Sequence, residues 1–134
     1  RTTPPGRAVG GQTASLPDDA RVSPADPSLP VELQRFSGAW DGWCGPQAPR
    51  SVKVVVESIN STGGTIAYAN GGYGVAVFGA FGTRLSVNYI DGELVGAVPP
   101  GGGTVALRIR NDGHMDFINY WDHKRGCYGL LKRQ

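Results

Sequence analysis

Short runs of alternating or β-branched residues, separated by glycine-rich turns, fill the sequence from position 37 to the end. In residues 83–90, Leu85 and Val87 alternate with Arg84 and Ser86. Alternation with a period of two places apolar side chains on one face of a β-strand. The chain of 134 residues also contains 21 glycines and 10 prolines, which weaken helix interiors. The sequence therefore predicts an all-β fold without a long helix.

The runs predict nine strands, or eight if the weak run at 73–78 is left out. They lie at residues 37–44, 51–59, 65–69, 73–78, 83–90, 93–98, 104–110, 114–121 and 126–132. Asp91 and Gly92 stand between two of them, and this dipeptide favours a tight hairpin turn. Antiparallel strands joined in this way form an up-and-down barrel or a sandwich. We favour the barrel, because hairpin follows hairpin with little room for long crossovers.

Residues 1–35 differ from the rest of the chain. They hold six of the ten prolines, four basic and four acidic side chains, and none of the twelve aromatic residues. Proline lacks an amide donor, and so little apolar surface predicts an extended tail or linker before a barrel at 36–134. The alternative is an arm that becomes ordered on a partner. Leu29, Val31, Leu33 and Phe36 are the residues able to dock it on the barrel.

Cys44 ends the first predicted strand and Cys127 begins the last. These strands are neighbours in a closed up-and-down barrel, so we predict a Cys44–Cys127 disulfide. The alternative is two buried free thiols. A disulfide would indicate an oxidising compartment, and a chain that begins with Arg1 is compatible with a removed export signal. We expect an exported protein, periplasmic or secreted.

Charge and hydropathy exclude several classes of protein. The formal net charge of +2 and the scattered basic residues disfavour a nucleic-acid interface. The longest apolar runs are too short for a transmembrane helix. Two cysteines alone do not make a structural zinc site. We therefore predict no nucleic-acid partner, no transmembrane segment, no metal and no cofactor.

Gly38, Ala39 and Trp40 on the first strand, with Lys132 and Arg133 at the end of the last, resemble the calycin-like (lipocalin-like) small barrels. The resemblance implies that Trp40 closes one end of the barrel. It also implies that a basic residue, Arg133 or Arg125, packs across the tryptophan. The size and the layout of tail and barrel are closer to small exported bacterial barrels, including the metalloprotease-inhibitor type. No inhibitory position carries over to this chain.

Two polar groups of residues are candidates for chemistry. His114 and Asp116 share a strand face, and Asp122 and His123 follow it, so the four could hold a metal or form a base with its orienting partner. We favour a solvated turn and loop for them, and we assign no catalytic residue. Alternate positions similarly place Arg84, Arg108 and Arg110 on one wall with Lys53, which suits an anionic ligand if it faces inward. We favour an outward, solvated wall.

The aromatic residues are the remaining candidates. A ligand cavity inside the barrel would be lined by Trp40, Tyr89, Phe117, Tyr120 and Trp121. The same side chains can instead fill the interior of an eight-stranded barrel. An exposed rim that binds a protein is predicted among the glycines of residues 71–82, at Tyr73, Phe78 and Phe81 with Tyr68. Its alternative is a glycine-rich loop folded over the barrel mouth.

Together these features predict a non-enzymatic exported β-barrel that binds a protein partner through its rim and tail. The first alternative is a lipocalin-like carrier of a small apolar ligand. The second is an accessory β-barrel domain or subunit of an enzyme, and the third is a structural module of the cell envelope.

Overall fold

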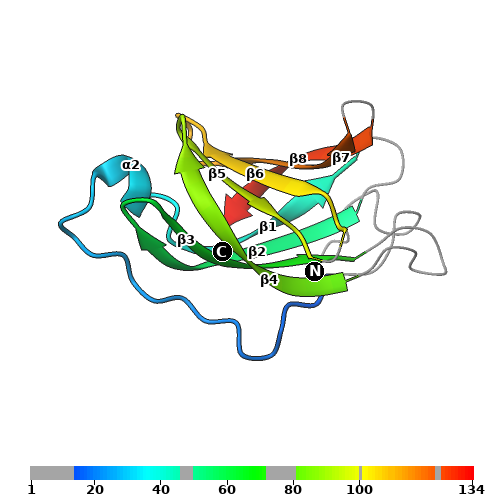
Figure 1. Ribbon diagram of the computed structural model, residues 1–134, viewed down its shortest axis with the longest axis horizontal. Helices are drawn as coiled ribbons and strands as arrows, with labels where there is room; N and C mark the ends of the chain where they lie inside the picture. The colour runs from blue at the N-terminus through cyan, green and yellow to red at the C-terminus, as the bar shows by residue number, and fades with distance from the viewer. Residues whose placement is uncertain (1–13, 46–49, 72–80, 100, 123–124) are drawn as a thin grey trace.

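The computed structural model describes residues 14–45, 50–71, 81–99, 101–122 and 125–134. Eight antiparallel strands form one closed barrel in which every strand pairs with its neighbours in the sequence (Figure 1). The strands are β1 (Gly38–Cys44), β2 (Arg50–Asn60), β3 (Gly63–Asn70), β4 (Phe81–Ile90), β5 (Glu93–Ala97), β6 (Thr104–Ile109), β7 (Met115–Asp122) and β8 (Arg125–Arg133). The up-and-down barrel is confirmed. The run predicted at 73–78 lies outside the described residues.

Tight turns link strands at the end of the barrel where β2, β4 and β6 finish. Asp91 and Gly92 both have positive φ, 51° and 84°, which matches the hairpin that the dipeptide predicts. The only helix among the described residues is one turn long, α2 (Val31–Gln34). It lies at the same end as the β2–β3 hairpin (Figure 1). Its Leu33 is buried, as is Phe36 just after it, so these two residues seal that end of the core.

β1 and β8 close the barrel. Trp40, Asp41 and Cys44 pair with Arg133, Lys132 and Gly129 across this seam. A side chain at Gly129 would collide with the carbonyl oxygen of Trp43 and with Cys44, so only glycine allows the two strands to approach this closely. The predicted disulfide is confirmed: Cys44 and Cys127 are bonded, with Cα atoms 5.4 Å apart and 83 positions apart in sequence.

The interior is filled by side chains from all eight strands. The largest fully buried ones include Trp40, Tyr68, Ile66 and Phe117. They alternate along each strand with residues on the outer wall, as the period of two predicts.

Residues 14–30 run along the outside of the barrel without forming a strand and then enter α2 (Figure 1). Of the residues considered for docking, Leu33 and Phe36 are buried and Leu29 packs partly against the core, whereas Val31 is 62% exposed.

Candidate functional site

Trp40 lies at the end of the barrel that α2 covers, and it is completely buried. Its indole nitrogen donates to the carbonyl oxygen of Phe36 at 3.1 Å. The guanidinium carbon of Arg133 lies 4.2 Å from the centre of the tryptophan ring. The two terminal nitrogens of Arg133 donate to the carbonyl oxygens of Ser37 and Arg35, at 2.6 and 2.7 Å. Arg133 thus occupies the position that the resemblance assigns to the basic residue, and the group fastens the segment before β1 across the end of the barrel.

The five aromatic residues predicted to line a ligand cavity do not gather around one space. Phe117 is buried in the core, with its ring centre 5.5 Å from that of Tyr68. Tyr89 is half-buried and contacts Phe36 edge-on, with ring centres 6.2 Å apart. Tyr120 follows the buried Asn119 on the outward side of β7, and Trp121 is 40% exposed. Trp40 and Phe117 therefore fill the interior, and Tyr120 and Trp121 belong to the surface.

A buried polar network lies inside the barrel towards the opposite end from α2. The Tyr68 hydroxyl donates to Asn119 Oδ1 at 3.1 Å and accepts from Asn70 Nδ2 at 3.2 Å. Asn119 Nδ2 donates in turn to the carbonyl oxygens of Gly102 and Thr104. Burial raises the pKa of Tyr68 to about 12. Hydrogen bonds across the lumen tie β3, β7 and the segment before β6 together, so this network occupies space that a carrier would keep open.

The sequence reasoning missed the asparagines of this network. Asn119 continues the inward series of Met115 and Phe117, and Asn70 continues that of Ile66 and Tyr68. Polar residues at inward positions of two alternating strands were the available signal.

The rim residues predicted for protein binding stand between β3 and the start of β4 in the sequence. Tyr73 and Phe78 lie outside the described residues. The backbone of Phe81 begins β4, where it pairs with Asn70 of β3.

Three of the exposed apolar side chains among the described residues, Trp121, Tyr128 and Leu130, lie on β7 and β8, whereas Val22, Val31 and Ile90 are exposed singly elsewhere. Tyr128 is 67% exposed and Leu130 is 38% exposed. The register places Tyr128 beside Ile118 of β7, and Leu130 beside Trp43 of β1. We call this the β7–β8 surface, and it comprises Trp43, Ile118, Tyr120, Tyr128 and Leu130.

A surface groove of about 280 Å³ adjoins the β7–β8 surface, with Tyr128 and Ile118 in its wall. Glu93, Arg108 and Asp116 contribute its charged lining. Arg108 Nε lies 3.1 Å from Glu93 Oε2, so part of that charge is already paired. The sequence reasoning did not single out Tyr128 or Leu130. Their alternation with the inward Cys127 and Leu131 was the signal that could have found them.

The arginines considered for an inward anion site lie on the outer wall. Arg84 pairs with Glu57 and Asp19, and Arg110 lies 3.3 Å from Asp116. Their guanidinium groups stay partly exposed beside carboxylates. This arrangement is the outward wall that the sequence favours.

His114 and Asp116 do not form a paired base. The carboxylate of Asp112 accepts from the backbone nitrogen of His114 at 3.0 Å, and this contact lowers the pKa of Asp112. The side-chain nitrogen Nδ1 of His114 lies 3.1 Å from the same oxygen, without the geometry of a hydrogen bond. His123 lies outside the described residues. Among the residues that the structure describes, no three His, Cys, Asp or Glu side chains are grouped to hold a metal ion.

Comparison with protein-family models, with curated proteins and with solved structures gives no match for this chain. In the part of the chain that the structure describes, no helix is long and apolar enough to cross a membrane.

Proposed function

We propose that this chain is a non-enzymatic, exported β-barrel that binds a protein partner through the β7–β8 surface. The observation that carries the proposal is the exposure of Tyr128 and Leu130 on neighbouring outward positions of β8, beside a groove with a charged lining. Aromatic anchors surrounded by polar groups are typical of protein interfaces. Arg108, Asp116 and Glu93 supply such a polar border.

The interior supports binding at the surface over transport of a small ligand. Trp40, Phe117 and Tyr68 occupy the lumen, and the Tyr68–Asn119 hydrogen bond crosses it. A carrier of the lipocalin type needs an open cavity in the same place. The oxidised Cys44–Cys127 pair supports export, because disulfides persist in oxidising compartments.

A calycin-like architecture is part of the same proposal. Its support is the eight-stranded closed barrel together with the packing of Arg133 on Trp40.

The test is affinity capture with the full chain as bait, from the exported fraction of the source cells. Tyr128→Ser and Leu130→Ser are expected to reduce capture of a discrete partner at least tenfold. Ile90→Ser is the matched control, because Ile90 is 51% exposed at the α2 end of the barrel and is expected to leave capture unchanged. Each variant is first checked by its thermal unfolding midpoint.

Two results would contradict the proposal. The first is capture that is the same for all four baits. The second is no partner at all, combined with a saturable rise in unfolding temperature when the chain is mixed with fatty acids, haem or aromatic ligands. That second result would move the function to a small-ligand carrier.

A further inference from the structure

A second feature of the outer wall is a row of small outward residues that crosses β2, β3 and β4. Ala67 and Ala69 of β3 have no exposed surface, and Ser51 of β2 is 5% exposed. The two alanines face away from the core because their neighbours Ile66 and Tyr68 point into it, and Ser51 faces away because its neighbour Val52 points into it. Gly82 of β4 pairs with Ala69 and extends the row of small residues. We call this row the outer trough.

Residues 14–23, here called the arm, occupy the outer trough. At one end, the backbone nitrogen of Ala14 donates to Ser51 Oγ at 3.0 Å, and Ala14 is 2% exposed. The carbonyl oxygen of Ser15 and the ring of Pro17 face Gly82, where a larger residue would collide with that oxygen. The trough is therefore shaped to the backbone of an extended peptide.

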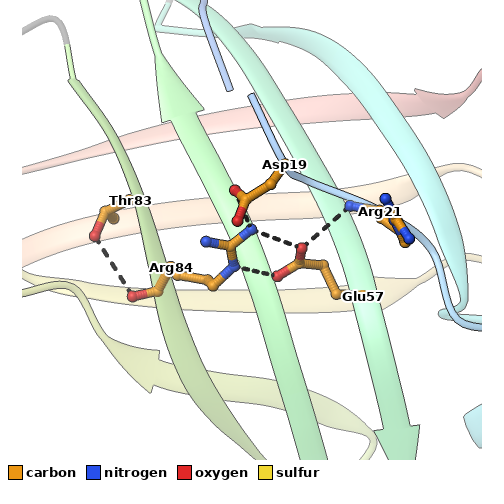
Figure 2. Close-up of polar contacts among 5 residues, drawn as sticks. All are labelled: Asp19, Arg21, Glu57, Thr83 and Arg84. Carbon is orange, nitrogen blue, oxygen red and sulfur yellow. Dashed lines mark hydrogen bonds and ion pairs between the residues drawn. The ribbon is translucent and has the colours of Figure 1, made fainter. Parts of the chain in front are cut away.

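The other end of the arm is held by charge and backbone hydrogen bonds (Figure 2). Glu57 Oε2 accepts from the backbone nitrogen of Arg21 at 3.2 Å, and the Glu57 carbonyl oxygen accepts from Ser23 at 2.7 Å. Arg84 binds Glu57 through two nitrogens, at 2.7 and 3.0 Å, and reaches Asp19 at 2.8 Å. Hydrogen bonds from Arg84 lower the pKa of both Glu57 and Asp19. Figure 2 shows Arg84 between the two carboxylates.

The backbone hydrogen bonds that close the barrel do not involve the arm. β1 to β8 close without it, and it adds no strand. It joins the barrel through an exposed turn in which Leu29 donates to the carbonyl oxygen of Asp26 and Ser28 donates to the Asp26 carboxylate. The arm is thus a segment bound to the outside of a barrel that closes without it.

We propose that the outer trough is a peptide-binding site whose exchangeable ligand is the arm of a second copy of this chain. A second copy can supply every contact just described, so the exchanged and unexchanged forms differ mainly at the turn of residues 24–28. This is the low-cost route by which chains exchange identical elements. Because a tethered arm has an effective concentration of the order of millimolar, exchange rises with protein concentration.

The first experiment tests whether the ligand can be exchanged. A protease recognition sequence is inserted between Pro27 and Ser28 of the full chain, and the folded protein is cut there. A fluorescent peptide of residues 14–27 is expected to bind the cut protein saturably, measured by anisotropy. An Asp19→Ala version of the peptide is expected to bind about two- to fivefold more weakly, because the Asp19–Arg84 ion pair is exposed, and this change leaves the folding of the barrel untouched.

Arginine variants locate the site on the barrel. Arg84→Ala in the cut protein is expected to weaken binding at least tenfold. Arg108→Ala is the matched control, since Arg108 also pairs with a carboxylate on the outer wall but lies away from the trough. Tyr128→Ser is expected to bind the peptide like the wild type, which separates this site from the proposed function of the β7–β8 surface.

The second experiment tests the source of the ligand. Two copies of the uncut chain with different mass labels are refolded together at rising concentration and examined by native mass spectrometry. Mixed dimers are expected to rise with protein concentration in the wild type and in Arg84→Ala alike, because the exchanged and unexchanged forms share the Arg84 contacts. Three results would each overturn the proposal. The folded cut protein takes up no peptide, or the affinity for the peptide is unchanged by both Asp19→Ala and Arg84→Ala, or the uncut protein stays monomeric at millimolar concentration.

Discussion

Ionisation of Tyr68 tests how the buried network contributes to stability. The folded protein raises the pKa of this hydroxyl from 10.0 to about 12, with burial as the main cause. The protonated form is therefore favoured in the folded state, and its contribution is fully present below pH 10. It is lost as the pH rises from 10 towards 12. A shift of two pKa units corresponds to about 2.7 kcal/mol, at 1.36 kcal/mol per unit.

Tyr68→Phe provides the comparison. The substitution removes the hydrogen bonds of the hydroxyl with Asn119 and Asn70. At about 1 kcal/mol for each, the variant is expected to be roughly 2 kcal/mol less stable than the wild type at pH 8. Above pH 10 the wild type alone carries the cost of ionising this residue. The two stability curves should converge and meet near pH 11 to 12, where that cost reaches about 2 kcal/mol.

The assay is urea unfolding of both proteins at half-unit steps from pH 8 to pH 12, with tyrosinate absorbance recorded for the native state. Tyr128→Phe is the matched control, because Tyr128 is 67% exposed, and it is expected to follow the wild-type curve. A stability difference between wild type and Tyr68→Phe that stays constant over this range would refute the reasoning. So would a gap that widens with pH.

Three further variants, with two more for comparison, test the closure of the barrel, each by the midpoint of urea unfolding. Arg133→Ala removes the contact with the Trp40 ring and two hydrogen bonds to carbonyl oxygens, so the free energy of unfolding is expected to fall by about 2–3 kcal/mol. Arg133→Lys should recover only part of this loss. Full stability in Arg133→Ala would contradict the role of Arg133 in closing the barrel. Replacing both Cys44 and Cys127 by alanine removes a covalent link between residues 83 positions apart, and the free energy of unfolding is expected to fall by about 4.5 kcal/mol. A reduced wild type that is as stable as the oxidised protein would contradict this expectation. Gly129→Ala is expected to lower the free energy of unfolding by about 1–3 kcal/mol, because the new Cβ meets the β1 backbone. Gly126→Ala on the same strand should cost less, because the nearest atoms to its new Cβ are 3.3 Å away or more. Equal losses in the two variants would contradict the packing argument.

The sequence was sufficient for the fold because the information is local. Alternation in residues such as Leu85 and Val87 sets the inward face, and Asp91 with Gly92 sets a hairpin. Once consecutive strands pair, the order of the strands alone brings Cys44 and Cys127 together, so the disulfide followed from topology.

The two surface sites could not be predicted from local sequence patterns in this way. Exposure of Tyr128 depends on the absence of a covering segment among the described residues, and no local pattern reports that. Ala67 and Ala69 are buried for the opposite reason, because a distant segment of the chain covers them. They lie on the outward side of β3, and they are buried although an isolated strand would expose them. A period of two assigns a residue to a face, but it does not say which faces a distant segment of the chain will cover.

The outer walls of this barrel differ in a way that separates the two proposed interactions. Small residues at Ser51, Ala69 and Gly82 allow a peptide backbone to approach β2, β3 and β4. The arm contacts this wall largely through its main-chain atoms and one carboxylate, which meet Ser51, Glu57 and Arg84. Tyr128 and Leu130 project from β8 and leave no such room, so a partner must fit side chains instead. The outer trough consequently selects an extended chain with a carboxylate opposite Arg84. The β7–β8 surface instead favours a partner whose apolar surface is complementary in shape to these side chains. Because no strand of the trough belongs to β7 or β8, substitutions in one wall should leave binding at the other unchanged, provided that the closed barrel is intact.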